Sequence, residues 1–167
     1  ELKLTKGPVF VREELQHLAA LFGDAARGRG LHFEVRAGIG VPDEVEGDAL
    51  RLRQVLTNLV SNANKYTPNG GQITIQAQPT PDRWNGHDDR HVVLVTIQDN
   101  GLGISPEDQL QIFQKFFRAP DQKAREAPGT GLGLNITKNL VEMQGGVIWF
   151  ESEFRQGTTF YFTIPVA

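Results

Sequence analysis

The sequence predicts a two-layer α/β sandwich, with one sheet covered by helices on one side and open to water on the other. Several stretches alternate apolar and polar residues, as half-buried strands do, so they have one polar face. Strands and helices do not alternate regularly along the chain, which disfavours a doubly wound parallel sheet. With 167 residues, the chain is long enough for one domain with one hydrophobic core.

The first half of the chain predicts two helices and two strands. Residues 1–8 are expected to form an extended entry. Apolar residues then recur at helical spacing, at Val11, Leu15, Leu18, Phe22 and Ala25. This helix stops at Gly28, and a strand is expected over residues 31–36. Asp48 caps a helix that runs to about residue 65, and a second strand covers residues 72–78.

The second half predicts three strands and two helices around polar loops. Residues 79–89 are expected to be a polar loop, and 121–128 a mobile one. Ser105, followed by Pro-Glu-Asp, predicts the start of another helix. A longer helix is expected over residues 134–145. The strands are expected over residues 91–99, 147–153 and 158–165.

Composition excludes several classes of function. Seventeen Lys and Arg residues against twenty Asp and Glu residues give a net charge of −3, which argues against broad binding to nucleic acids or anionic membranes. The absence of cysteine excludes disulfides, thiol catalysis and cysteine-ligated zinc. No apolar run approaches the roughly 20 residues that span a bilayer, and no signal peptide opens the chain. Because no Met precedes Glu1, we expect the chain to be part of a longer one.

The helix over residues 48–65 carries a polar stripe beside its apolar one. Asn58, Asn62 and Lys65 stand at i, i+4 and i+7, so they line up along one face. Asn oxygens are hard ligands suited to Mg²⁺, and a lysine pairs with phosphate oxygens. The stripe therefore fits a metal–phosphate group, although an ordinary solvated helix face would look the same.

Asp99 ends a strand whose apolar residues share its face. A carboxylate at the end of a buried apolar row needs a hydrogen-bond donor. The exocyclic amine of adenine, together with the adjacent ring nitrogen, would be a suitable partner. Gly101 and Gly103 remove side chains where a flat base must approach the backbone. Asp-x-Gly-x-Gly also fits a plain Asx turn after a strand.

Two further segments carry chemistry. Residues 129–133 are glycine-rich and open a helix, where free amides and the positive dipole end bind phosphate. Their Gly-x-Gly-x-Gly spacing is neither the dinucleotide fingerprint nor a Walker motif, and the protein-kinase motifs are missing. Three aromatics before the polar loop, Phe113, Phe116 and Phe117, either anchor that loop while Lys115 or Arg118 reaches phosphate, or are ordinary core aromatics beside a surface cation. The hydroxyl of Thr158 points inward, toward a base or a neighbouring carbonyl.

In combination and order, these segments resemble the ATP-binding catalytic domain of sensor histidine kinases. That domain belongs to the superfamily of gyrase, heat-shock chaperone and mismatch-repair ATPases. Residues 48–68 resemble its N box, 99–104 its G1 box, 112–118 its F box and 129–134 its G2 box. The resemblance implies a mixed, mostly antiparallel sheet with helices on one face, the Bergerat-type ATP-binding fold. Residues 9–167 would form this domain, and 1–8 a linker from dimerisation helices.

The resemblance also implies a role for each matching residue. Asn62 would ligate the Mg²⁺ that bridges the phosphates, and Asn58 would support the same site. Lys65 and Arg118 would neutralise phosphate charge, which completes the expected catalytic set. Asp99 would accept a hydrogen bond from adenine N6. The other residues expected at the nucleotide are Tyr66, Gly101, Gly103, Ile104, Lys115, Gly129, Thr130, Gly131, Leu132, Gly133, Leu134 and Thr158.

The implied reaction is transfer of the γ-phosphoryl group of ATP to a histidine on separate dimerisation helices, followed by relay to a response regulator. The histidines of this chain, His17, His32, His87 and His91, do not have the context of a phosphoacceptor. His87 and His91 could also form a metal pair. We therefore expect a cytoplasmic, monomeric domain that binds ATP and Mg²⁺ without contacting nucleic acid or a membrane. The parent protein could be a membrane sensor.

Three alternatives share this fold. One is a serine kinase of the anti-sigma type, which usually lacks the linker-like entry and the full F box. Another is a degenerate module that uses the fold only for partner contacts, against which the intact boxes argue. A third is an ATP-hydrolysing clamp like gyrase, which normally needs a Glu base where this chain has Asn58.

Overall fold

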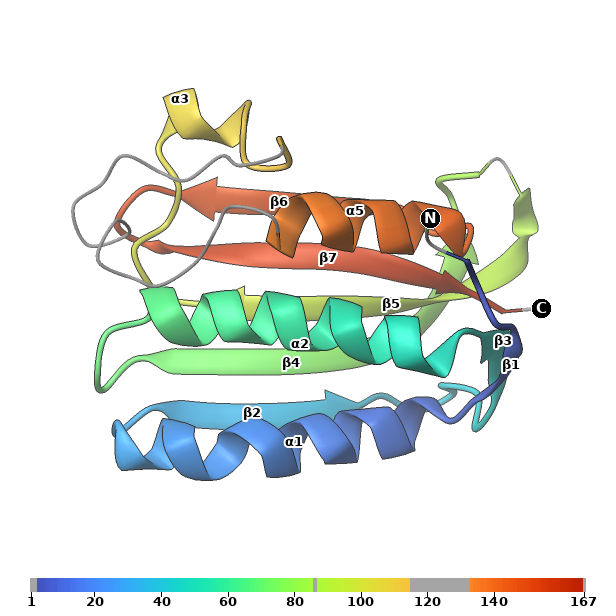
Figure 1. Ribbon diagram of the computed structural model, residues 1–167, viewed down its shortest axis with the longest axis horizontal. Helices are drawn as coiled ribbons and strands as arrows, with labels where there is room; N and C mark the ends of the chain where they lie inside the picture. The colour runs from blue at the N-terminus through green and yellow to red at the C-terminus, as the bar shows by residue number, and fades with distance from the viewer. Residues whose placement is uncertain (1–2, 86, 115–132, 167) are drawn as a thin grey trace.

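A five-stranded sheet and a layer of helices on one of its faces make up the molecule (Figure 1). The computed structural model describes residues 3–85, 87–114 and 133–166, with the backbone alone for residues 87–89. The helices are α1 (Val11–Gly28), α2 (Ala49–Tyr66), α3 (Pro106–Gln109) and α5 (Gly133–Met143). The strands are β1 (Gly7–Val9), β2 (His32–Ala37), β3 (Val45–Gly47), β4 (Gln72–Asp82), β5 (His87–Asp99), β6 (Ile148–Glu153) and β7 (Gly157–Pro165).

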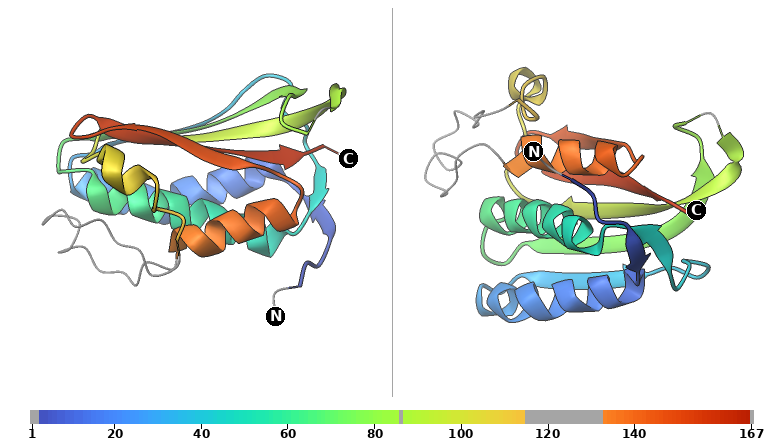
Figure 2. Two further views of the ribbon diagram at one scale, coloured as in Figure 1. Left: turned by 90° about the horizontal axis from the view of Figure 1, so that it is seen from above. Right: turned by 45° about the vertical axis from the view of Figure 1, so that its right-hand side comes forward.

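The sheet is mixed and mostly antiparallel, with the strand order β2-β4-β5-β7-β6. Only the β2–β4 pair of this sheet is parallel. The edge-on view in Figure 2 shows α1, α2 and α5 together on one side of the sheet. The predicted two-layer sandwich is therefore confirmed.

The core lies between the helices and the inner face of the sheet. Helix α2 is central, and Asp48 caps its start by accepting a hydrogen bond from the Arg51 amide at 3.1 Å. Its predicted apolar stripe is buried, at Leu52, Val55, Leu56, Leu59 and Ala63. The inner sides of β4 and β5 are buried against the helices, at Ile73, Ile75, Ala77, Val93, Val95 and Ile97. The alternation predicted for these strands is confirmed.

The expectation of a polar loop over residues 79–89 is wrong. β4 continues to Asp82 and β5 begins at His87, so the two strands form a longer hairpin. Prolines at 79 and 81 suggested a loop because proline cannot donate to a strand ladder. β2 pairs with β4 only as far as Ala77, so beyond that residue β4 is an edge strand and tolerates proline.

One short strand pair and a short helix complete the architecture. β1 pairs with β3, so Gly7 and Pro8, which we expected to belong to the linker, lie opposite Gly47 and Glu46. The predicted helix start at Ser105 is confirmed, because its hydroxyl accepts from the Asp108 amide, but the helix has only 4 residues. Within the described ranges, no helix combines the length and apolarity needed to cross a bilayer.

Candidate functional site

Several predicted segments meet at the end of the sheet where α2 and β5 finish and β7 begins (Figure 1, left). Asp99 lies directly opposite Thr158 in the β5–β7 register. The carbonyl of Tyr66, the last residue of α2, accepts a hydrogen bond from the Leu102 amide at 3.1 Å. The N-box helix, the loop after β5 and the start of β7 are therefore in direct contact.

Asp99 is a partly buried carboxylate at this end of the sheet. It continues the buried row of β5, as predicted, and its Oδ1 accepts a hydrogen bond from the Gly101 amide at 2.9 Å. Burial raises the pKa of Asp99 to about 6, although backbone donors at Gly101 and Thr158 act in the opposite direction. A desolvated carboxylate of this kind favours a ligand that brings its own hydrogen-bond donor.

Gly101 and Gly103 are required by contacts within the protein. A Cβ atom at Gly101 would collide with the carbonyl oxygen of Tyr66, and one at Gly103 with the carbonyl oxygen of Glu153. Gly103 also has a φ of +67°, a conformation that L side chains rarely adopt. We expected these glycines to make room for a base, whereas the contacts in the structure are with neighbouring backbone.

Ser152 of β6 connects the loop after β5 to β7, and sequence reasoning missed it. Its hydroxyl accepts from the Ile104 amide at 2.8 Å and donates to the Gly157 carbonyl at 3.0 Å. Thr158, which is 7% exposed, lies 2.8 Å from the same hydroxyl. Because the Ser152 proton is used by the Gly157 carbonyl, the Thr158 hydroxyl donates to Ser152 and keeps its lone pairs as acceptors. Thr158 points inward, as predicted.

The polar stripe of α2 is present, and one of its members contacts α5. Asn58 and Asn62 are half-buried and Lys65 is exposed. The Asn58 side-chain amide donates to the hydroxyl of Thr137 on α5 at 3.2 Å. That hydroxyl donates in turn to the carbonyl of Gly133, the first residue of α5, at 2.6 Å. The N-box helix and the start of the helix after the glycine-rich segment are thus joined.

Arg29, which follows α1, holds the end of α2 and was not predicted from the sequence. Its guanidinium donates to the carbonyls of Asn64 and Thr67 at 2.5 and 2.6 Å. It also donates to the side-chain oxygens of Asn64 and Asn69, each at 3.0 Å. The last carbonyls of a helix have no partner within it, so this arginine fixes the turn from which Tyr66 contacts the loop.

The structure describes only part of the F box and of the G2 box. Phe113 packs edge-on against Phe150 and Phe160, with ring centroids 5.8 and 6.4 Å apart, as a core aromatic does. The ammonium of Lys138 lies 5.3 Å from the centroid of the Phe113 ring. Gly133 is exposed and Leu134 packs against the core. The following predictions lie outside the described residues: Lys115, Phe116, Phe117, Arg118, the loop over 121–128, Gly129, Thr130, Gly131 and Leu132.

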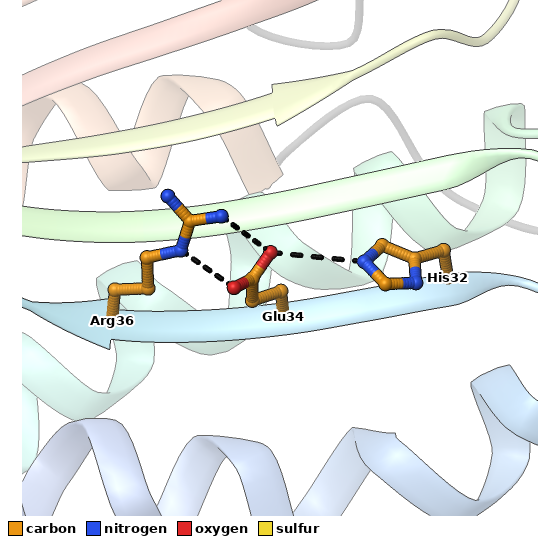
Figure 3. Close-up of polar contacts among 3 residues, drawn as sticks. All are labelled: His32, Glu34 and Arg36. Carbon is orange, nitrogen blue, oxygen red and sulfur yellow. Dashed lines mark hydrogen bonds and ion pairs between the residues drawn. The ribbon is translucent and has the colours of Figure 1, made fainter.

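A second polar cluster lies on the outer face of β2, at the other edge of the sheet from β6 (Figure 3). Glu34 accepts from Arg36 at 2.6 and 2.7 Å and lies 3.7 Å from His32. Phe33 and Val35 pack toward the core, so this cluster faces away from the helices and from the candidate site. The His87 side chain is outside the described part, so the His87–His91 pair stays a prediction.

Comparison with known proteins supports the resemblance to histidine kinase ATP-binding domains that the sequence motifs indicate. Residues 47–167 match the model of the "Histidine kinase-, DNA gyrase B-, and HSP90-like ATPase" family. The chain is 38% identical over 165 residues to the signal transduction histidine-protein kinase BarA of Escherichia coli, covering 98% of this chain and 17% of BarA. It is 37% identical over 164 residues to the sensor histidine kinase GacS of Pseudomonas protegens, with the same coverage. The chain thus spans less than a fifth of these relatives.

Solved structures show the same fold. The catalytic domain of histidine kinase ThkA matches with a TM-score of 0.77 and 30% identity, over 97% of this chain and 98% of that one. Full-length ShkA in complex with AMPPNP matches with a TM-score of 0.79 and 28% identity, over 99% of this chain and 32% of that one. The chain therefore belongs to the histidine kinase-, DNA gyrase B- and HSP90-like ATPase family, as a catalytic domain of the histidine kinase type.

Proposed function

We propose that this chain binds ATP with Mg²⁺ at the candidate site, which α2, β5 and β7 form at one end of the sheet. It then transfers the γ-phosphoryl group to a histidine of a separate dimerisation domain. The Asp99 carboxylate carries this proposal, because it is a partly desolvated acceptor at the end of an apolar row. Adenine offers a donor at N6 and a flat apolar ring, so it suits both the carboxylate and its surroundings. Thr158, directly opposite Asp99, is the neighbouring polar contact for the base.

Mg²⁺ fits the donors that α2 offers. Asn58 and Asn62 stand one helical turn apart and carry carboxamide oxygens, which are hard ligands for this ion. When bound, the ion would neutralise phosphate charge. Asn62 is the proposed ligand, and Lys65 on the last turn of α2 pairs with phosphate. Arg118 and Lys115 supply further positive charge.

The remaining proposed contacts follow from the family motifs. Tyr66 flanks the nucleotide, while Gly101, Gly103 and Ile104 form the loop beside the base. Residues 129–134 cover the phosphates, with backbone amides at the start of α5 as donors. The chemistry is mostly positioning and charge neutralisation, as in other phosphoryl transfers.

The partners we propose are dimerisation helices, joined through residues 1–8 to the domain over 9–167, and a response regulator. One structural neighbour, ThkA, was solved in complex with the response regulator protein TrrA, with a TM-score of 0.74. Because none of the four histidines has a phosphoacceptor context, this chain does not phosphorylate itself. The domain is monomeric and belongs to the cytoplasmic part of its parent protein.

Nucleotide titration tests this function. We expect the chain to bind ATP more tightly with Mg²⁺ than with a chelator, and to prefer ATP over GTP, which has no exocyclic amine at the corresponding ring position. Asp99→Asn should weaken ATP binding by about 5- to 150-fold, since an unpaired buried group costs about 1–3 kcal/mol. Asp24→Asn, the same change at a carboxylate that is 95% exposed on α1, is the control and should bind as the unmodified chain does. Equal affinity of the Asp99 and Asp24 variants would refute the proposed site.

A further inference from the structure

The hydroxyl of Thr137 lies between the N-box helix and the helix after the glycine-rich segment. We propose that Thr137 is a positioning residue that fixes the orientation of the Asn58 carboxamide, so that Asn58 presents its oxygen to the magnesium–phosphate group. This proposal rests on the proposed function, and it deepens it by assigning a role to a residue outside the family motifs. Thr137 itself is 0% exposed, so it does not touch the nucleotide.

Two hydrogen bonds fix the direction of the Thr137 hydroxyl. Its oxygen lies 2.6 Å from the carbonyl oxygen of Gly133 and 3.2 Å from Nδ2 of Asn58. A hydroxyl has one proton, and a carbonyl oxygen can only accept. The proton therefore points at Gly133, and the lone pairs of the hydroxyl face Asn58.

The lone pairs select one of the two orientations of the Asn58 carboxamide. With Nδ2 toward Thr137, the amide donates to an acceptor, as the structure has it. With the group flipped, Oδ1 would face those lone pairs at the same distance, and the two acceptors would repel. The selected orientation leaves Oδ1, the atom that can ligate Mg²⁺, outside this contact.

The same contact joins two parts of the proposed site. Asn58 stands one turn before Asn62 on the polar stripe of α2, and Gly133 is the first residue of α5, directly after the glycine-rich segment. An outer-sphere hydrogen bond that orients a metal ligand commonly changes metal affinity by about 10–100-fold. A mere packing role for Thr137 would require only its volume, which valine also supplies.

The test compares four variants of the chain: Thr137→Val, Thr137→Ser, Asn58→Ala and the double variant Thr137→Val with Asn58→Ala. ATP affinity is measured calorimetrically with Mg²⁺ and with a chelator, at a temperature where every variant is folded by circular dichroism. We expect Thr137→Val to weaken Mg²⁺-dependent ATP binding about tenfold. Binding with the chelator should change less than about twofold, and Thr137→Ser, which keeps the hydroxyl, should retain affinity within about twofold.

The double variant shows whether Thr137 acts through Asn58. If it does, Thr137→Val causes less than about a twofold further loss in the Asn58→Ala background. An equal loss in both backgrounds, an equal loss with and without Mg²⁺, or no loss at all would overturn the proposal.

A measurement without nucleotide separates this proposal from the proposed function. By NMR, the Asn58 side-chain amide protons should exchange slowly with water in the unmodified chain and at least about tenfold faster in Thr137→Val. Fast exchange in the unmodified chain would overturn the orientation of Asn58. Slow exchange together with no Mg²⁺-dependent ATP affinity would instead refute the proposed function.

Discussion

The two ends of the sheet are stabilised in different ways. At the candidate site, the loop after β5 is fastened by backbone hydrogen bonds and by contacts that only glycine permits, at Gly101 and Gly103. At the opposite end, the β4–β5 hairpin is fastened by aromatic side chains on the outer face. Apart from Asp99 and Ser152, which accept hydrogen bonds from amides of this loop, the first end is held by backbone contacts, whereas the aromatic end is held by its side chains.

The aromatic end is a second cluster, outside the core. Trp84, in the turn between β4 and β5, reaches over β5 and β7 to Trp149 of β6, with ring centroids 5.1 Å apart. Trp149 stacks in turn on Tyr161 of β7 at 5.1 Å. Val92, on the outer face of β5, is fully buried. The turn itself is held by Asp82, which accepts from the backbone amides of Trp84 and Asn85.

The largest effect is expected from a side chain at the glycine-dependent end. Gly103→Ala places a Cβ against the Glu153 carbonyl and forces alanine into a φ of +67°. We expect the free energy of unfolding to fall by about 3 kcal/mol, measured by urea denaturation. Gly28→Ala is the matched control, since a Cβ at the end of α1 meets nothing within 4 Å. If both variants are equally stable, the loop is not constrained by this contact.

Sequence patterns predicted the elements whose burial alternates, and missed those that depend on distant partners. Asp99 and Thr158 were placed correctly because each continues the parity of a buried row. β3 is too short to show alternation and exists through its pairing with β1. Arg29 donates to the Asn64 carbonyl 35 residues away, Ser152 accepts from the Ile104 amide 48 residues away, and Thr137 accepts from Asn58 79 residues away, so no local pattern shows these roles.

The next effect concerns the charge of Asp99. Its pKa in the folded state is about 6, above the unfolded value of 3.8, so the folded state binds the proton more tightly. Stability is then full below about pH 4 and falls as the pH rises to about 6, by about 3 kcal/mol in total. Asp99→Asn, which has no charge to bury, should therefore be more stable than the unmodified chain by about 2–3 kcal/mol at pH 7.5.

Urea denaturation at several pH values checks this prediction. The difference between Asp99→Asn and the unmodified chain should disappear at about pH 3, below the unfolded pKa of 3.8, where Asp99 is mostly neutral in both the folded and the unfolded state. A difference that does not change with pH would mean that burial of this charge is not its cause. Greater stability together with weaker ATP binding would mark Asp99 as a residue retained for function.

A smaller effect is expected at the aromatic end. Trp84→Ala removes the stack on Trp149 and should lower the free energy of unfolding by about 1–2 kcal/mol. ATP affinity should stay within about twofold, because this turn lies at the other end of the sheet from Asp99. Phe154→Ala is the control, since both residues are 37% exposed but Phe154 lies against Arg155 and, among the described residues, stacks on no aromatic ring. If Trp84→Ala weakens ATP binding tenfold, the two ends are coupled, and the contrast between them fails.

The smallest effect is expected on the outer face of β2, where Arg36 and Glu34 form two short hydrogen bonds. These side chains are open to water, and the contact with Arg36 that lowers the pKa of Glu34 competes with solvent. Arg36→Gln should therefore leave the urea midpoint unchanged. Arg29→Gln is the informative comparison, because Arg29 donates to backbone carbonyls at the end of α2 that have no partner within the helix, and its loss should cost about 1–2 kcal/mol. Equal effects of the two substitutions would mean that the carbonyls at the end of α2 lose nothing without Arg29, whereas the expected difference means that stability follows what the arginine's partners would lack without it.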